Sequence, residues 1–194
     1  KPVIRFAGQP DDESATSLLW DGEWEITWVT FRDMGAAFMV ALLGIYVLVV
    51  AQFRSFKLPL VILTPVPLTL VGIVIGHMLF SAPFTATSMI GFIALSGIIV
   101  RNSILLVDFS TQLRRAEMEL MTAIERAGEV RFLPVLLTSV TAIGGLLALA
   151  LSGNPLYAPL AWVIIGGLIS STLLSRIVVP AMYLLLVRGA PPPE

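Results

Sequence analysis

Two long stretches of this sequence contain no Asp, Glu, Lys or Arg: the 43 residues between Lys57 and Arg101, and the 44 residues 132–175. One helical crossing of a membrane needs about 20 apolar residues. Each stretch therefore has room for two crossings, and Gly, Pro, Asn and Ser near its middle, at 81–85 and 152–157, mark a turn. A shorter uncharged run covers 36–53. The sequence predicts five transmembrane helices, at about 36–53, 58–80, 86–108, 132–151 and 158–186.

The composition agrees with a membrane protein, because 57% of the residues are hydrophobic and only 13% are charged, against about 25% in soluble domains. Helices of this length satisfy their own backbone in lipid, so the fold class is an all-α membrane protein. With no cysteine and one histidine, we expect no metal site and no cofactor. No catalytic Ser-His-Asp arrangement or phosphate loop is present, so we expect no enzyme. The net charge of -1 does not indicate nucleic-acid binding.

Basic residues predict the orientation. They lie in the loop 54–57, in the loop 110–131 and at Arg188, whereas the turns 81–85 and 152–157 contain none. Loops rich in Lys and Arg stay in the cytoplasm, so we expect a cytoplasmic C-terminus and a multi-pass protein whose N-terminal segment lies on the other side. An odd number of crossings agrees with this.

The remaining segments are assigned by pattern. Residues 1–34 are expected to be the end of a domain outside the membrane, with a strand at 23–31 because Trp24, Ile26 and Trp28 alternate with polar residues. Residues 111–128 read as a short amphipathic helix on the cytoplasmic surface, and 189–194 as a C-terminal tail. The first residue, Lys1, favours a chain cut from a longer protein.

Arg101 is the residue that most needs explanation, because it lies in the third predicted crossing. It is about 10 Å from Asp108 along the helix, and a charged side chain inside the membrane costs several kcal/mol unless it snorkels or is paired. Asn102 and Ser103 follow it, and Thr138 and Ser139 reach a similar depth on the fourth crossing. Snorkelling is one interpretation, and a buried functional cation is the other. No carboxylate lies at the depth of Arg101 in any crossing, and Asp108 is at the edge of its helix, so a buried functional cation needs a partner outside this sequence.

Several ordered motifs resemble one known family. "GFIALSGIIVRNSILLVDF", "AIERAGEVRFLPVLLTSVTAIGGLLALAL", "IIGGLISSTLLSRIVVPAMYLLL" and "FRSFKLPLVILTPVPLTLVG" together resemble the C-terminal membrane half of resistance–nodulation–division (RND) efflux permeases. The resemblance covers about residues 35–188.

The resemblance implies a fold and a mechanism. Such permeases have twelve helices in two halves with periplasmic insertions, so residues 1–34 would end a periplasmic α+β domain. They sit in the bacterial inner membrane as homotrimers, with a periplasmic adaptor and an outer-membrane channel. Proton entry drives export through an acidic pair in the first half, which here would be the missing N-terminal half.

The same resemblance assigns the proton relay to Arg101, Asn102 and Thr138. Arg101 and Asn102 match the family's lysine and asparagine, and Arg131 matches a basic residue; Ser139 and Asp108 are further candidate supporting residues. Arginine keeps the charge of lysine but is effectively never deprotonated. We therefore expect part of a proton-driven efflux transporter for drugs or metals. A relative that serves protein secretion or lipid export, and a structural membrane subunit, are the alternatives.

Overall fold

The computed structural model describes residues 3–5, 14, 16–19 and 23–187, and it divides the chain into two units, 1–39 and 40–194. In the first unit, strand β1 (Val3–Arg5) pairs in parallel with strand β2 (Ser17–Leu19). Helix α1 (Glu23–Phe53) begins in this unit and continues into the second. The predicted C-terminal tail 189–194 and most of residues 1–22 lie outside the described residues.

The predicted strand at 23–31 is wrong, because these residues form the first turns of α1. Glu23 and Glu25 lie in the first turn, where acidic side chains interact favourably with the positive end of the helix dipole. Trp24 and Trp28 are also spaced i, i+4, so they share a helix face as readily as a strand face. A short alternation of apolar and polar residues does not distinguish the two structures here.

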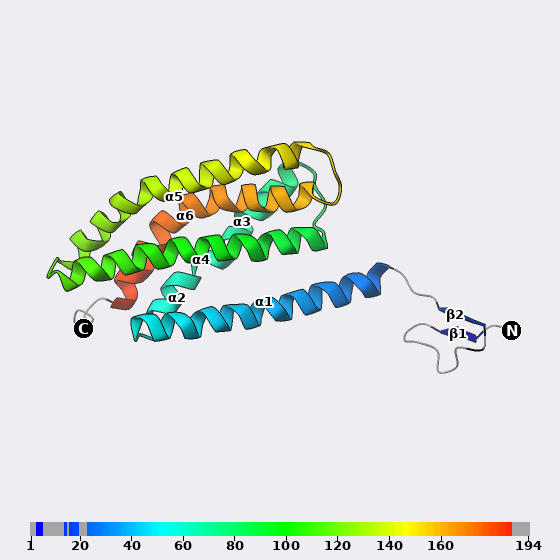
Figure 1. Ribbon diagram of the computed structural model, residues 1–194, viewed down its shortest axis with the longest axis horizontal. Coiled ribbons are helices and arrows are strands. Elements are labelled where there is room, and N and C mark those ends of the chain that lie inside the picture. The colour runs from blue at the N-terminus through cyan, green and yellow to red at the C-terminus, as the bar shows by residue number, and fades with distance from the viewer. Residues whose placement is uncertain (1–2, 6–13, 15, 20–22, 188–194) are drawn as a thin grey trace. The chain divides into compact units, whose positions relative to one another are not determined.

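The second unit is a bundle of helices (Figure 1). It contains α2 (Leu58–Leu63), α3 (Pro65–Leu79), α4 (Ala86–Arg115), α5 (Leu120–Leu151) and α6 (Ala158–Val187). Helix α6 is the central element, since α3, α4 and α5 all pack extensively against it. Its buried residues include Val163 and Leu168, which are 0% and 1% exposed.

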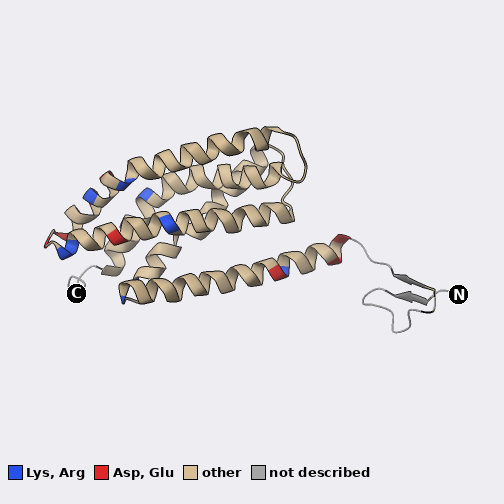
Figure 2. Cartoon of the chain, in the orientation of Figure 1, with Lys and Arg blue, Asp and Glu red and all other residues tan. Residues whose placement is uncertain are grey.

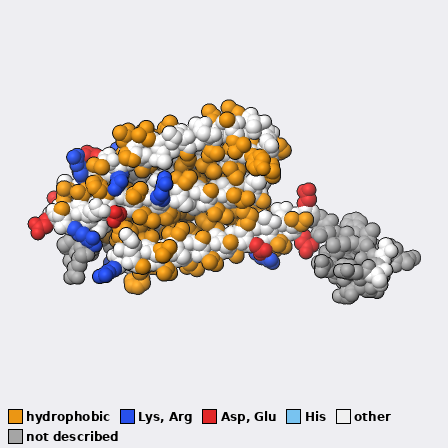
Figure 3. Space-filling view, in the orientation of Figure 1, with side chains coloured by type: hydrophobic (Ala, Val, Ile, Leu, Met, Phe, Trp, Pro, Cys, Tyr) orange, Lys and Arg blue, Asp and Glu red, His pale blue; other side chains and the backbone are white. Residues whose placement is uncertain are grey.

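The all-α membrane fold is confirmed. Among the described residues, five helical segments are long and apolar enough to cross a membrane, with α2 and α3 forming one segment. The break between α2 and α3 falls at Thr64, just before Pro65, because proline lacks the N–H that would continue the helix ladder. Hydrophobic side chains cover most of the visible face of the bundle (Figure 3), as a surface in contact with lipid tails requires.

The predicted separate helix at 111–128 is wrong. Residues up to Arg115 continue α4, and α5 begins at Leu120 and passes through Gly128 and Pro134 without a break. The chain reverses at Glu117, whose backbone φ of 60° lies in the left-handed region and ends the regular helix. The sequence changes from apolar to polar at the membrane surface, but the backbone hydrogen bonds of a helix can continue past that point.

Basic side chains gather at one end of the second unit, where α4 ends and α5 begins (Figure 2). The opposite end, at the turns before α4 and α6, contains no Lys or Arg. This end is called the uncharged end below, and the other the basic end. Because the two ends of the bundle differ in charge, the depth of an intramembrane residue can be given as its distance along the helix from one of these ends.

Candidate functional site

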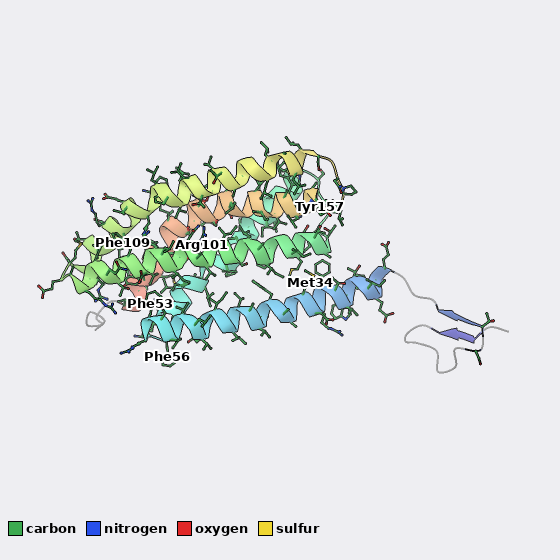
Figure 4. The ribbon with its side chains drawn as sticks, in the orientation of Figure 1. Met34, Phe53, Phe56, Arg101, Phe109 and Tyr157 are labelled. Carbon is green, nitrogen blue, oxygen red and sulfur yellow. The ribbon has the colours of Figure 1, made fainter. Side chains whose placement is uncertain are left out.

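Arg101 lies on the side of α4 that faces away from the bundle (Figure 4). The buried side of α4 includes Ile99 and Ser103, whereas Arg101 is exposed. Arg101 lines a groove of about 440 Å³ between α4 and residues 45–53 of α1, and the other lining side chains are almost all apolar. Within the described part of the chain, Arg101 has no ion-pair partner.

The depth of Arg101 follows from helix geometry. It lies about 22 Å from the start of α4 at Ala86, while the hydrocarbon core is about 30 Å thick. Its Cα is therefore inside the hydrocarbon region, one or two turns from the basic end. A guanidinium at this position needs either an acceptor or access to the lipid–water interface.

Asn102 points toward a second polar site inside the bundle. A cavity of about 60 Å³ lies between α4, α5 and α6, on a different side of α4 from the groove that Arg101 lines. Its lining residues with polar or charged side chains are Asn102, Ser103, Arg131, Thr172, Ser175 and Arg176. Polar and charged side chains from three helices thus meet at one cavity whose wall is otherwise apolar.

The two arginines of this cavity are held by aromatic rings. The Arg131 guanidinium carbon is 5.1 Å from the centroid of the Phe109 ring, and that of Arg176 is 4.1 Å from the centroid of Phe132. Such cation–π contacts fix the guanidinium planes. Arg131 Nε is buried and has no hydrogen-bond partner, which is a costly state for a donor on a charged group.

The two neighbouring hydroxyl residues of α5, Thr138 and Ser139, lie on different sides of the helix. Ser139 is 4% exposed, and its Oγ lies 2.9 Å from Thr172 Oγ1 on α6. Thr138 is exposed and donates its hydroxyl to the Pro134 carbonyl of its own helix. Ser139 therefore links α5 to α6, while the Thr138 side chain is exposed on the outer side of α5.

The structure brings together only some of the predicted site residues. Asn102 and Arg131 line the same cavity, whereas Arg101 and Thr138 lie on other sides of their helices. Asp108 accepts a hydrogen bond of 2.8 Å from Gln112 Nε2 and is not part of the cavity lining. The relay assignment of these residues stays a prediction. Arg101 and Thr138 are exposed, so the site is open to its surroundings on those two sides.

Sequence reasoning did not place the α6 residues Thr172, Ser175 and Arg176 in this site. The signal was the run of hydroxyl residues at 170–172 and Ser175 beside Arg176, which lie within two turns of one helix. His77 lies in the last turn of α3. It is 9% exposed, with Nδ1 3.0 Å from the Ile73 carbonyl and Nε2 3.1 Å from Ser88 Oγ.

The fold and the site together define a polytopic membrane protein with basic residues set into its helices, as in proteins that move solutes or ions across membranes. Residues 14–187 match the model of the AcrB/AcrD/AcrF family. The chain belongs to this family, which comprises RND efflux permeases.

Similar proteins agree with the family assignment. The chain is 37% identical to the multidrug resistance protein MdtC of Erwinia tasmaniensis over 75% of the chain and 15% of that protein. It is 33% identical to the cobalt-zinc-cadmium resistance protein CzcA of Cupriavidus metallidurans over 88% of the chain and 16% of that protein. A crystal structure of a heavy metal efflux pump superposes with a TM-score of 0.75 at 30% identity, covering 91% of the chain and 18% of the pump. The chain thus spans less than a fifth of the length of these relatives.

Proposed function

We propose that this chain contributes the cationic side of an intramembrane proton relay in a proton-driven RND efflux transporter. Arg101 supplies the charge, Asn102 and Thr138 supply polar contacts, and Arg131, Ser139 and Asp108 support them. The observation that carries the proposal is an arginine inside the hydrocarbon depth, exposed on its helix, without an ion-pair partner among the described residues.

The partner of Arg101 in this proposal is a pair of carboxylates on a helix outside this chain. A buried guanidinium and carboxylate attract strongly, and leaving either one alone is costly. When the carboxylates bind protons they lose their charge, so Arg101 is released and turns toward the interface or another acceptor. Because arginine does not release its own proton, it acts as a counter-charge, and the protons travel on the carboxylates.

Coupling to transport follows from the two arrangements of Arg101. Each protonation state favours one packing of α4 against the neighbouring helices, and a difference in charge pairing is enough to shift such an equilibrium. The exposure of Arg101 on α4 and of Thr138 on α5 supports this proposal, because both side chains can be contacted at this depth by helices outside this chain.

The cellular setting is part of the same proposal. The chain would lie in the bacterial inner membrane, with the basic end in the cytoplasm and residues 1–34 at the end of a periplasmic domain. The assembly would be a trimer that works with a periplasmic adaptor and an outer-membrane channel. The relatives named above include a multidrug and a cobalt-zinc-cadmium resistance protein, so drugs and divalent metal ions are the two cargo classes to test.

The experiment uses the full-length transporter in a bacterial strain without its own efflux pumps. Susceptibility is measured against a panel of drugs and against Zn²⁺, Co²⁺ and Cd²⁺. We expect Arg101→Ala to reduce export at least tenfold, because removing one partner of a buried charge pair costs several kcal/mol. Arg101→Lys keeps the charge and is expected to retain part of the activity.

The matched control is Arg54→Ala, which removes one positive charge from an exposed position outside the hydrocarbon depth. It should leave export unchanged at equal expression. Proton release from reconstituted vesicles, followed with a pH-sensitive dye, separates coupling from cargo binding. Full export and full proton flux by Arg101→Ala would show that Arg101 only snorkels and has no role in the relay.

A further inference from the structure

We propose that the cavity between α4, α5 and α6 is a binding site for the phosphate group of an anionic phospholipid at the basic end of the bundle. Arg131 and Arg176 are its charged ligands, and Asn102 and Ser175 supply additional hydrogen bonds. This proposal shares Asn102 and Arg131 with the proposed relay, but it does not require Arg101, which lines the groove on a different side of α4.

The positive charge of the cavity favours binding of an anion. Two guanidinium groups line it, and none of its described lining residues is Asp or Glu. Two like charges in one small, partly desolvated cavity repel each other unless a negative group lies between them. Planar guanidinium groups bind phosphate oxygens through paired N–H donors, so a phosphate matches both the sign and the geometry.

The arginines are positioned but not neutralised. Each guanidinium carbon lies over a phenylalanine ring, that of Arg131 over Phe109 and that of Arg176 over Phe132, and such a contact does not neutralise the positive charge. The buried Nε of Arg131 has no acceptor. An anion in the cavity would accept hydrogen bonds from the guanidinium N–H groups that line it, whereas Arg131 Nε has no accessible surface and would not be reached directly.

The two arginines of the site lie nearer the basic end than Arg101 does, while Asn102 lies at the depth of Arg101. Arg176 lies about 27 Å from the start of α6 at Ala158, and Arg131 about 30 Å from the end of α5 at Leu151. Since the hydrocarbon core is about 30 Å thick, both arginines reach the level of the lipid headgroups. Arg176 is exposed, so a headgroup can enter from the lipid side. Basic pockets between membrane helices bind anionic headgroups in this way.

The size of the cavity excludes larger ligands. Its volume of about 60 Å³ is far below the 300–1,000 Å³ of typical drug pockets. It accommodates a compact group such as a phosphate, whose glycerol and acyl chains would continue outward along the apolar helix surfaces. Efflux cargo of drug size does not fit this volume.

Native mass spectrometry of the purified chain in detergent tests the proposal. The delipidated protein is titrated with phosphatidylglycerol, with zwitterionic phosphatidylcholine of the same acyl chains, and with inorganic phosphate. We expect one tightly retained phosphatidylglycerol per chain and at least tenfold weaker retention of phosphatidylcholine. Arg176→Gln should weaken phosphatidylglycerol binding about tenfold, and Arg176→Lys should weaken it less, because it keeps the charge but loses the planar fork.

The control variant is Lys57→Gln, which removes one exposed positive charge at the same end of the bundle without touching the cavity. It should bind phosphatidylglycerol like the unaltered chain. Equal binding by Arg176→Gln and Lys57→Gln would overturn the proposal, since the lipid would then respond only to general surface charge. Displacement of the lipid by millimolar inorganic phosphate would overturn the assignment to a phospholipid and indicate a site for free phosphate. Arg131→Gln, with folding checked by circular dichroism, tests the second ligand in the same assay.

Discussion

Gly72 on α3 and Gly166 on α6 let these two helices approach closely. A Cβ atom added at Gly166 would lie 2.6 Å from the Gly72 carbonyl oxygen, and one added at Gly72 would collide with the Gly166 carbonyl and the Ser170 side chain. Backbone atoms cannot move aside as a flexible side chain can. Small residues therefore determine the distance between α3 and α6, as they do at many membrane helix contacts.

We expect Gly72→Ala to destabilise the bundle by about 1–3 kcal/mol, the usual cost of forcing an extra carbon into a packed contact. The measurement is thermal unfolding of the purified protein in detergent, followed by circular dichroism. Gly44→Ala is the matched control, because a Cβ at Gly44 meets nothing within 4 Å and alanine favours the helix by up to about 1 kcal/mol. If both variants unfold at the same temperature, the close α3–α6 approach is not needed for stability.

Residue-level detail of the site was only partly predictable. The depth of Arg101, Asn102 and Ser139 follows from counting residues along a helix. The direction of each side chain does not, because neighbouring residues on a helix point about 100° apart and the position of the neighbours decides which direction is inward. Asn102 turns toward α6, and α6 is distant in the sequence, so its Thr172 could be paired with Ser139 only after the packing was known.

At the scale of elements, the first turn of α4 is tied to α3 by a small polar network. Ser88 is fully buried. Its Oγ lies 3.1 Å from His77 Nε2 and accepts a hydrogen bond of 3.2 Å from the Thr85 backbone N–H. The Ile73 carbonyl is an acceptor for His77 Nδ1–H at 3.0 Å, which leaves Nε2 to accept the Ser88 hydroxyl proton. One serine thus satisfies a helix N-terminus and a buried histidine together.

Ser88→Ala should therefore lower stability by about 1–3 kcal/mol, since it leaves the Thr85 N–H and His77 Nε2 without their partner in a buried site. Thermal unfolding in detergent measures the change. Thr141→Ala is the control, because Thr141 is exposed and its hydroxyl bonds only to carbonyls of its own helix. A melting temperature for Ser88→Ala as high as that of the control would contradict the network.

The number of membrane-crossing helices was predictable because it depends on local chemistry, whereas the strand at 23–31 and the separate helix at 111–128 were wrong. Uncharged runs of sufficient length, divided by Gly, Pro, Asn and Ser, allow one arrangement of five crossings. The ends of the helices were less predictable. Helix α1 begins at Glu23 and α5 at Leu120, each well outside the apolar run, because hydrogen bonding along a helix continues across a change in polarity. The hydropathy of the sequence indicates where the chain enters the lipid. The end of a helix depends on a separate signal, such as the left-handed backbone at Glu117.

At the scale of the whole molecule, the distribution of charge predicts one orientation in the membrane. The basic end contains the loops at 54–57 and 116–119 together with Arg114, Arg115 and Arg126, while the turns 81–85 and 152–157 contain no basic residue. Positively charged loops are retained in the cytoplasm during insertion. In this orientation Arg131 and Arg176 lie in the cytoplasmic leaflet, where anionic headgroups attract basic residues.

The absence of cysteine from the sequence makes this orientation directly testable. Asn154→Cys places one thiol in the exposed turn at the uncharged end, and Ala116→Cys places one in the exposed turn at the basic end. In right-side-out spheroplasts, we expect a membrane-impermeant maleimide to label Asn154→Cys and to label Ala116→Cys only after the membrane is permeabilised. The reverse pattern would place Arg131 and Arg176 in the periplasmic leaflet. Labelling of both positions before permeabilisation would mean that the two turns do not lie on opposite sides, which contradicts the five-crossing arrangement itself.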